Sequence, residues 1–171
     1  MLISKKINDA INQQIGNEFG ASLQYVAIAV SFDQQALPRL AAHFYQQATE
    51  ERDHAMKFVK FIVDADGEVK IPAVPAPKAK FATAEEAVKL SLDWEVEVTG
   101  QIHNLVALAK KENNYTTDTF LQWFVAEQLE EVSAMDNLLK VIRMAGQGGL
   151  LRVEEWIARQ AGKAAAPETM T

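Results

Sequence analysis

Glu51 and His54 stand three residues apart in the stretch ATEERDHAM, residues 48–56. On a helix, side chains three or four residues apart face the same side, so this spacing places a carboxylate and an imidazole together between Phe44 and Phe58. Burying such groups among aromatic rings costs free energy unless each one is paired or bound. Because carboxylates and imidazoles are both metal ligands, the chemistry indicated is metal binding.

Apolar periodicity shows which elements would position these residues. Apolar residues at helical spacing predict a helix over 5–36. Pro38 suits the first turn of a second helix that runs to about Asp66, with Gly67 in the left-handed position after its end. The next segment, EVKIPAVPAPKAKF, has prolines and no helical period, and it is too long for a tight turn between helices. We therefore expect it to cross over along the length of a helical bundle.

The second half of the chain predicts three further helices. Thr83 and Glu86 have the spacing of a capping box and open a helix that runs to about Lys111. The remaining elements are, in chain order, a helix from about Thr117 to Ala145, the turn GQGG, and an amphipathic helix from Leu150 to about Gln160. No strand alternation is present. The predicted fold class is all-α: a four-helix bundle with a long crossover between helices two and three, plus a short C-terminal fifth helix.

Each of the four long helices has an acidic residue near the middle of its inward seam. Followed in steps of three and four, the seams are Ile11, Ile15, Glu18, Ser22, Tyr25, Ala29 and Phe32; Leu40, Phe44, Gln47, Glu51, His54 and Phe58; Val88, Leu92, Glu95, Val98, Ile102 and Leu105; and Phe120, Phe124, Glu127, Glu131, Ala134, Leu138 and Val141. One such acid is usually a boundary residue or half of an ion pair. Several at one depth, with no Lys or Arg on the seams, would repel one another unless they were protonated. A pair of divalent cations removes that conflict.

The ligand types narrow the choice of metal. Carboxylates with a single imidazole make a hard, oxygen-rich site that suits iron or manganese, whereas structural zinc favours Cys and His. Two metals bridged by a carboxylate, roughly 3.5–4 Å apart, are the usual arrangement in such sites. With only one His, we expect the centre to favour ferric iron.

Composition sets further bounds. A chain of 171 residues is long enough for one domain with a sizeable core, and the absence of cysteine excludes disulfides, iron–sulfur clusters and thiol catalysis. A net charge of −6 weighs against nucleic acid as a partner. The N-terminus turns polar too soon for a signal peptide, and no apolar run is long enough to span a membrane. We expect a cytoplasmic protein with one domain over 1–162 and a flexible tail over 163–171.

In combination these motifs resemble those of prokaryotic non-haem ferritins, within the ferritin-like di-iron carboxylate family, over nearly the whole chain. The motifs are Glu18 with Tyr25 seven residues later, E-E-x-x-H at residues 50–54, Glu95, and E-Q-x-E-E at residues 127–131. The resemblance implies a ferritin-like bundle with a di-iron centre. By the same resemblance the first iron is held by Glu18, Glu51 and His54; the second by the bridging Glu51 with Glu95, Glu131 and Gln128; and a third site by Glu50, Glu127, Glu130 and Glu131. Tyr25 matches the tyrosine beside the ferroxidase centre.

Two departures separate the chain from relatives. Bacterioferritins carry E-x-x-H on both motif helices and a haem-ligating Met just after the bridging Glu, whereas this chain has Glu130 and Arg52 at those positions. Haem is therefore not expected. Asp118 matches an acidic residue of the three-fold pore of ferritin cages, but Leu121 stands where animal ferritins have the next pore acid.

The resemblance implies an iron-storage protein with ferroxidase activity. Such a protein oxidises ferrous to ferric iron with dioxygen or hydrogen peroxide and stores ferric oxyhydroxide inside a homo-oligomeric cage of about twenty-four subunits. Three alternatives remain open on the residues alone: a di-iron oxidase of an organic substrate, a smaller DNA-protecting cage, and a helical scaffold whose core acids are protonated.

Overall fold

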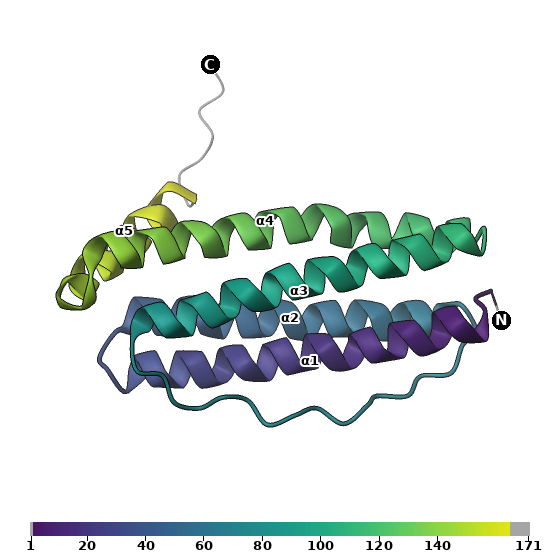
Figure 1. Ribbon diagram of the computed structural model, residues 1–171, viewed down its shortest axis with the longest axis horizontal. Helices are drawn as coiled ribbons and strands as arrows, with labels where there is room; N and C mark the ends of the chain where they lie inside the picture. The colour runs from purple at the N-terminus through teal and green to yellow at the C-terminus, as the bar shows by residue number, and fades with distance from the viewer. Residues whose placement is uncertain (1, 165–171) are drawn as a thin grey trace, which may run out of the picture.

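A computed structural model describes residues 2–164, with side chains to residue 160, and this part of the chain is helical and without strands. The elements are α1 (Lys5–Asp33), α2 (Pro38–Asp64), α3 (Ala84–Lys111), α4 (Tyr115–Ala145), the 3₁₀ turn η1 (Gln147–Gly149) and α5 (Leu150–Ala164). Helices α1 to α4 lie alongside one another as a bundle, and α5 packs across one end of α4 (Figure 1). The predicted four-helix bundle with a fifth helix is confirmed. Of the predicted tail, residues 163 and 164 continue α5, and 165–171 lie outside the described part.

The helix ends fall close to their predicted positions, and local hydrogen bonds explain the differences. α1 stops at Asp33 rather than residue 36 because Ala36 adopts a φ of 57° and the chain turns there. α4 begins two residues before Thr117 because the Asn114 side chain accepts a hydrogen bond from the Thr117 N–H at 3.0 Å and caps the helix. None of the described helices is both long and apolar enough to cross a membrane.

The end of α2 differs from the prediction. Asp66, not Gly67, takes the left-handed conformation, with a φ of 56°. The Gly67 N–H then bonds back to the Ile62 carbonyl at 2.8 Å, as in a Schellman motif. Position 67 requires glycine for a steric reason instead, because a Cβ atom there would lie only 2.4 Å from Oδ1 of Asn8. The prediction that Gly67 has the left-handed conformation was therefore wrong, although Gly67 does lie in the turn that ends α2.

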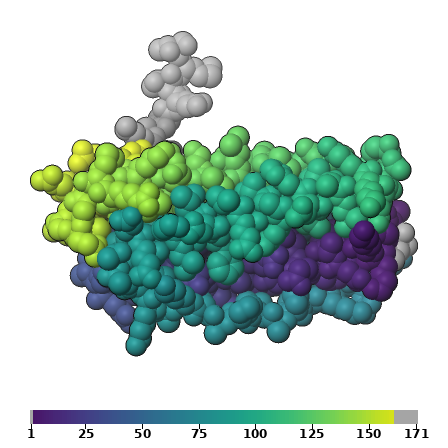
Figure 2. Space-filling view, viewed as in Figure 1, coloured from purple at the N-terminus to yellow at the C-terminus, as the bar shows by residue number. Residues whose placement is uncertain are grey.

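The crossover between α2 and α3 runs the length of the bundle against α1, along the lower edge of the molecule in this view (Figures 1 and 2). Buried amide side chains of α1 hold its backbone. Asn8 donates to the Glu68 carbonyl and accepts from the Glu68 N–H, both at 3.0 Å. Gln24 makes the same pair of bonds with Lys78, both at 2.9 Å, and Asn12 adds a bond to the Glu68 carbonyl at 2.8 Å. These amides satisfy backbone groups that the irregular segment cannot satisfy itself.

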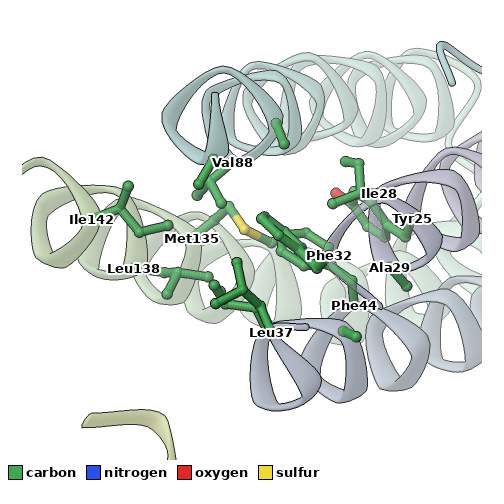
Figure 3. Packing of buried hydrophobic residues seen from close by; sticks show 14 of the residues in the cluster. Tyr25, Ile28, Ala29, Phe32, Leu37, Phe44, Val88, Met135, Leu138 and Ile142 are labelled. Carbon is green, nitrogen blue, oxygen red and sulfur yellow. The ribbon is translucent and has the colours of Figure 1, made fainter. Parts of the chain in front are cut away.

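Buried apolar side chains form two clusters, one towards each end of the bundle. The first contains Phe32, Phe44 and Met135, whose side chains point toward one another in Figure 3. The second contains Ile11 and Phe58. On every long helix the residues between the two clusters include the predicted acids, so the apolar core is interrupted at mid-depth by a polar layer.

The inward seam of α4 is shifted by one residue from the prediction at alternate positions. Ala134 is exposed, whereas Met135 is fully buried. Phe120, Glu127 and Val141 are half-buried, and the buried positions are Leu121, Gln128 and Ile142. The predicted and observed seams share Phe124, Glu131 and Leu138, and both alternate steps of three and four. Apolar pattern alone therefore did not distinguish them.

α5 is tied to the bundle through the start of α2. Leu37, which precedes α2, makes no side-chain cap. The Glu154 carboxylate of α5 takes that role, accepting from the Arg39 N–H and the Leu40 N–H at 2.8 Å each. A carboxylate at this position satisfies two otherwise free N–H groups and interacts favourably with the helix dipole. Val153, which is fully buried, anchors the same turn of α5.

Replacing Gly16 by Ala tests how tightly the crossover packs on α1. A Cβ atom at Gly16 would lie 2.3 Å from Cγ of Pro72 in the crossover, so we expect G16A to destabilise the fold by about 1–3 kcal/mol. The control is G100A, since a Cβ atom at Gly100 meets nothing within 4 Å and Ala favours the helix by about 1 kcal/mol. Denaturant unfolding of chelator-treated protein measures both. Equal stability of the two variants would show that the crossover around Pro72 moves aside to accommodate the added methyl group at little cost in free energy.

Candidate metal centre

The polar layer brings together six of the predicted ligands from all four long helices. Each is almost fully buried, with exposed fractions of 1% for Glu18 and Glu95, 2% for Glu51, 3% for His54 and Gln128, and 7% for Glu131. Tyr25, on the same side of α1 as Glu18, is 0% exposed. Within the described residues, no Lys or Arg forms an ion pair with any of the four carboxylates. Among the described residues, the layer thus has several acids and a single basic side chain, His54, beside them.

Glu18, Glu51 and His54 form the tightest group. One ligand atom from each lies within 4.8 Å of the others, and Nδ1 of His54 is 3.3 Å from Oε2 of Glu51. Among the described residues, two buried oxygens, Oε2 of Glu18 and Oε1 of Glu51, have no N–H or hydroxyl donor, and the two carboxyls can only share a proton with each other. Buried polar atoms are rarely left unsatisfied, so these oxygens indicate a ligand. A cation among the three side chains would satisfy both, and the donor set fits iron.

Glu95 and Gln128 form the other half of the layer. The Tyr25 hydroxyl donates to Oε1 of Glu95, and Nε2 of Gln128 donates to Oε2 of Glu95 at 3.2 Å. Both oxygens of Glu95 are therefore held by neutral donors. A second cation at Glu95 would share these oxygens with their hydrogen-bond donors, whereas a first cation at Glu18 and Glu51 would meet two oxygens that have no N–H or hydroxyl donor among the described residues.

Burial dominates the electrostatics of the layer. It raises the pKa of Glu18 and of Glu51 well above the usual range, and nearby carboxylates, Glu51 and Glu95 respectively, raise them further. Burial also raises the pKa of Glu95, and that of Glu131 to about 7. Burial and the charge of Glu95 raise the pKa of Tyr25, so its hydroxyl stays a donor. Without cations these carboxyls therefore hold protons to higher pH than exposed carboxyls do, and bound cations would take the place of those protons.

The residues predicted for a third site are more dispersed. Glu50 is half-buried and accepts from Gln46 at 2.9 Å; Oε1 of Glu127 lies 4.0 Å from Nε2 of His54; and Glu130 is exposed. The described residues hold one close group of metal-ligand atoms, and Glu50, Glu127 and Glu130 are not in it. The third site therefore stays a prediction.

Neighbours of His54 were not identified as site residues from the sequence. The Trp123 ring packs edge-on to the imidazole at 5.4 Å between centroids, and Phe124 does so at 5.9 Å. Nζ of Lys57 covers the Trp123 ring at 4.2 Å. Trp123 is 42% exposed, so it lies between His54 and solvent. The only signal in the sequence was that Trp123 and Phe124 stand four and three residues before Glu127 on one predicted helix. Aromatic residues at that spacing are equally consistent with packing in the core.

The other two histidines, His43 and His103, and Arg52, which stands where bacterioferritins have a haem ligand, lie outside the polar layer. His43 is half-buried with its ring edge against Phe44, and His103 is exposed. Arg52, at the position where bacterioferritins have the haem ligand, is exposed and lies 3.5 Å from an oxygen of Asp53. A guanidinium is always protonated and has no lone pair for haem iron. That haem is absent from the protein remains a prediction.

Comparison with known proteins places these features in a family. The sequence matches the family model described as Ferritin-like domain over residues 8–145. It is 44% identical over 167 residues to "Ferritin BfrB" of Mycolicibacterium smegmatis, covering 98% of this chain and 92% of the relative. It is 36% identical over 145 residues to "Bacterial non-heme ferritin" of Staphylococcus aureus, covering 85% and 87%. The chain therefore belongs to the ferritin family.

Solved structures agree with the fold. An open pore ferritin from the archaeon Archaeoglobus fulgidus superimposes with a TM-score of 0.88 at 34% sequence identity, covering 91% of this chain and 96% of that one. The resemblance to prokaryotic non-haem ferritins drawn from the motifs is confirmed, and so is the ferritin-like fold class.

Glu131 should make the stability of the metal-free protein depend on pH. Its pKa is raised from 4.5 to about 7, so between these values the folded state binds a proton that the unfolded state has lost. Its contribution to stability is full below pH 4.5 and is lost as pH rises through about 7. At about 1.4 kcal/mol per pKa unit this amounts to roughly 3–4 kcal/mol. In E131Q this part of the pH dependence should disappear.

Denaturant unfolding of chelator-treated protein at about pH 5 and about pH 7.5 brackets the titration. The control is E97Q, because Glu97 is exposed and lies outside the polar layer. If wild type, E131Q and E97Q lost the same stability over this interval, the Glu131 carboxyl would be ionised in the folded protein at both pH values.

Proposed function

We propose that this protein takes up ferrous iron, oxidises it at the buried carboxylate layer and stores the ferric product. The observation that carries the proposal is the pair of buried, unpartnered oxygens of Glu18 and Glu51 beside His54 in a chain of the ferritin family. These three side chains would bind the first ferrous ion. Glu95 and Glu131, with Gln128, would complete a second position on the other side of Glu51.

The arrangement supports two one-electron oxidations in one place. Two ferrous ions supply two electrons. Dioxygen takes these two electrons with two protons to give hydrogen peroxide, or hydrogen peroxide takes two electrons with two protons to give two waters. Anionic carboxylates favour the ferric over the ferrous charge in a site shielded from water. The surrounding apolar clusters exclude water from the layer, which strengthens these interactions.

Tyr25 holds a proton at the edge of the centre. Its hydroxyl donates to Oε1 of Glu95, and burial raises its pKa, so the phenol remains neutral. By the family resemblance this tyrosine is also placed to donate an electron. Glu50, Glu127 and Glu130 would form a third iron position on the exposed side of the centre, where they could receive ferric iron as it leaves.

The ferric product would leave the layer and mineralise as an oxyhydroxide inside a cage. Support for a cage comes from family membership and from the likeness to a solved ferritin. The exposed apolar residues Leu23, Val30 and Leu129 give the long helices surfaces that self-association would cover. Asp118 in the first turn of α4 is a further acid for an iron route through such a shell.

E18Q separates the cost of the site from its activity. Removing one carboxylate at nearly constant volume should leave the stability of the metal-free protein unchanged or raise it by about 1 kcal/mol, because buried-charge repulsion is relieved. The same change deletes a ligand to the first iron, so fast ferrous oxidation should fall at least tenfold. Thermal melts and stopped-flow absorbance after aerobic ferrous addition measure the two effects, with E97Q as the exposed control. An E18Q variant that is less stable yet oxidises iron at the wild-type rate would make Glu18 a structural residue.

The cage predicts a large closed particle. Purified protein at neutral pH and moderate salt should have the mass of about twenty-four chains by light scattering or native mass spectrometry. After ferrous loading in air the particle should gain mass without changing its outer radius. Monomers or dimers alone would remove the storage function and leave the oxidation site standing.

A further inference from the structure

A buried glutamine, Gln14, donates a hydrogen bond to Glu18, a carboxylate of the proposed first iron position. Gln14 lies one helical turn before Glu18 on α1 and is 2% exposed. Its Nε2 donates to Oε1 of Glu18 at 2.9 Å. The other oxygen, Oε2 of Glu18, is buried and receives no N–H or hydroxyl hydrogen bond from the described residues. One oxygen of this carboxylate is thus held by the protein and the other is left for a ligand.

A second residue fixes which end of the Gln14 amide faces Glu18. An amide can present either its NH₂ group or its oxygen, and the oxygen would repel a carboxylate. Nδ2 of Asn17 donates to Oε1 of Gln14 at 3.3 Å, so the Gln14 NH₂ group is directed at Glu18. Asn17 is itself fastened to α3, since its Nδ2 also donates to Oε1 of Gln101 at 2.9 Å. The chain of amides runs from the half-buried Gln101 on α3 to the buried ligand.

The glutamine constrains how Glu18 can bind. A carboxylate with two free oxygens can rotate and chelate a cation through both. With Oε1 held by Gln14, rotation costs a buried hydrogen bond to a charged group, which is among the stronger kinds. Oε2 has no such donor among the described residues, so it is the oxygen that can bind a cation with Glu51 and His54 without straining the bond from Gln14.

We propose that Gln14 is a positioning residue that makes Glu18 a single-oxygen ligand of the first metal ion and leaves a coordination position of that ion open for the oxidant. This inference rests on the proposed iron site. The role of Gln14 is exerted through Glu18, and no contact between the glutamine and the metal is involved. Partners that orient metal ligands in this way are worth about 10- to 100-fold in metal affinity or activity.

The test uses Co²⁺ added without oxygen to the full-length, chelator-treated protein, because Co²⁺ binds such sites and its visible absorption reports its coordination number. Gln14→Met keeps the shape of the side chain and removes the amide. We expect the dissociation constant for the first Co²⁺ to rise roughly tenfold or more. At saturation the visible absorption should weaken relative to wild type, since Glu18 becomes free to chelate and raises the coordination number. A role of Gln14 in packing alone would not change that spectrum.

Gln122→Met is the matched control. Gln122 also donates to a carboxylate four residues away on its helix, Asp118, at 2.8 Å, but it is exposed and outside the polar layer. It should leave both the affinity and the spectrum as in wild type. A folded Gln14→Met variant with an affinity within twofold of wild type and an unchanged spectrum would overturn the proposal.

A further variant keeps the test decisive if Gln14→Met does not fold. Asn17→Ala leaves Gln14 in place and removes the hydrogen bond that orients its amide. Both the affinity and the spectrum should therefore change in the same direction as in Gln14→Met, but by a smaller amount. Wild-type affinity and spectrum in Asn17→Ala would then reject the role of the amide chain. Failure of wild-type protein to bind Co²⁺ in the layer would instead reject the proposed iron site itself.

Discussion

Repulsion among buried carboxylates in the middle of a helical bundle is the constraint on which the rest of the structure depends. Glu18, Glu51, Glu95 and Glu131 come from four different helices, and His54 is their one basic partner in the part of the chain that the structure describes. Such a layer destabilises the fold unless protons or cations neutralise it. The bundle tolerates it because an apolar cluster on each side supplies the packing that the middle lacks.

The arrangement of a polar layer between two apolar clusters explains why so much of the fold and the site could be predicted from the sequence. Long helices with a 3.6-residue apolar period predict a bundle directly, and an acid that interrupts such a period at mid-depth, as Glu95 does, is conspicuous. The α4 seam was harder to assign because Glu127 and Gln128 are both polar and adjacent, so the pattern did not show which faces inward. Burial shows that Gln128 does, beside Glu131, while Glu127 stays half-exposed.

Other features were beyond the sequence because they depend on the path of a segment without periodicity. Asn8 and Gln24 on α1 read as ordinary surface amides, yet both are buried against the crossover. Nothing in their spacing indicates an irregular chain passing over them. Gln14 has the same appearance in the sequence, and only the position of its partner distinguishes it. Helix α1 therefore carries amides for two purposes: fastening the crossover on one side and orienting a carboxylate on the other.

The carboxylate of Glu154 at the start of α2 has a consequence for how the chain folds as it is synthesised. The N–H groups of Arg39 and Leu40 are made 115 and 114 residues before their partner. When α1 and α2 have left the ribosome, the start of α2 therefore still lacks this cap, because Leu37 supplies no side-chain cap. That end of α2 remains prone to fraying through the synthesis of α3 and α4 and becomes fully bonded only when α5 emerges. Of the described elements, the last one translated thus completes the capping of the second one.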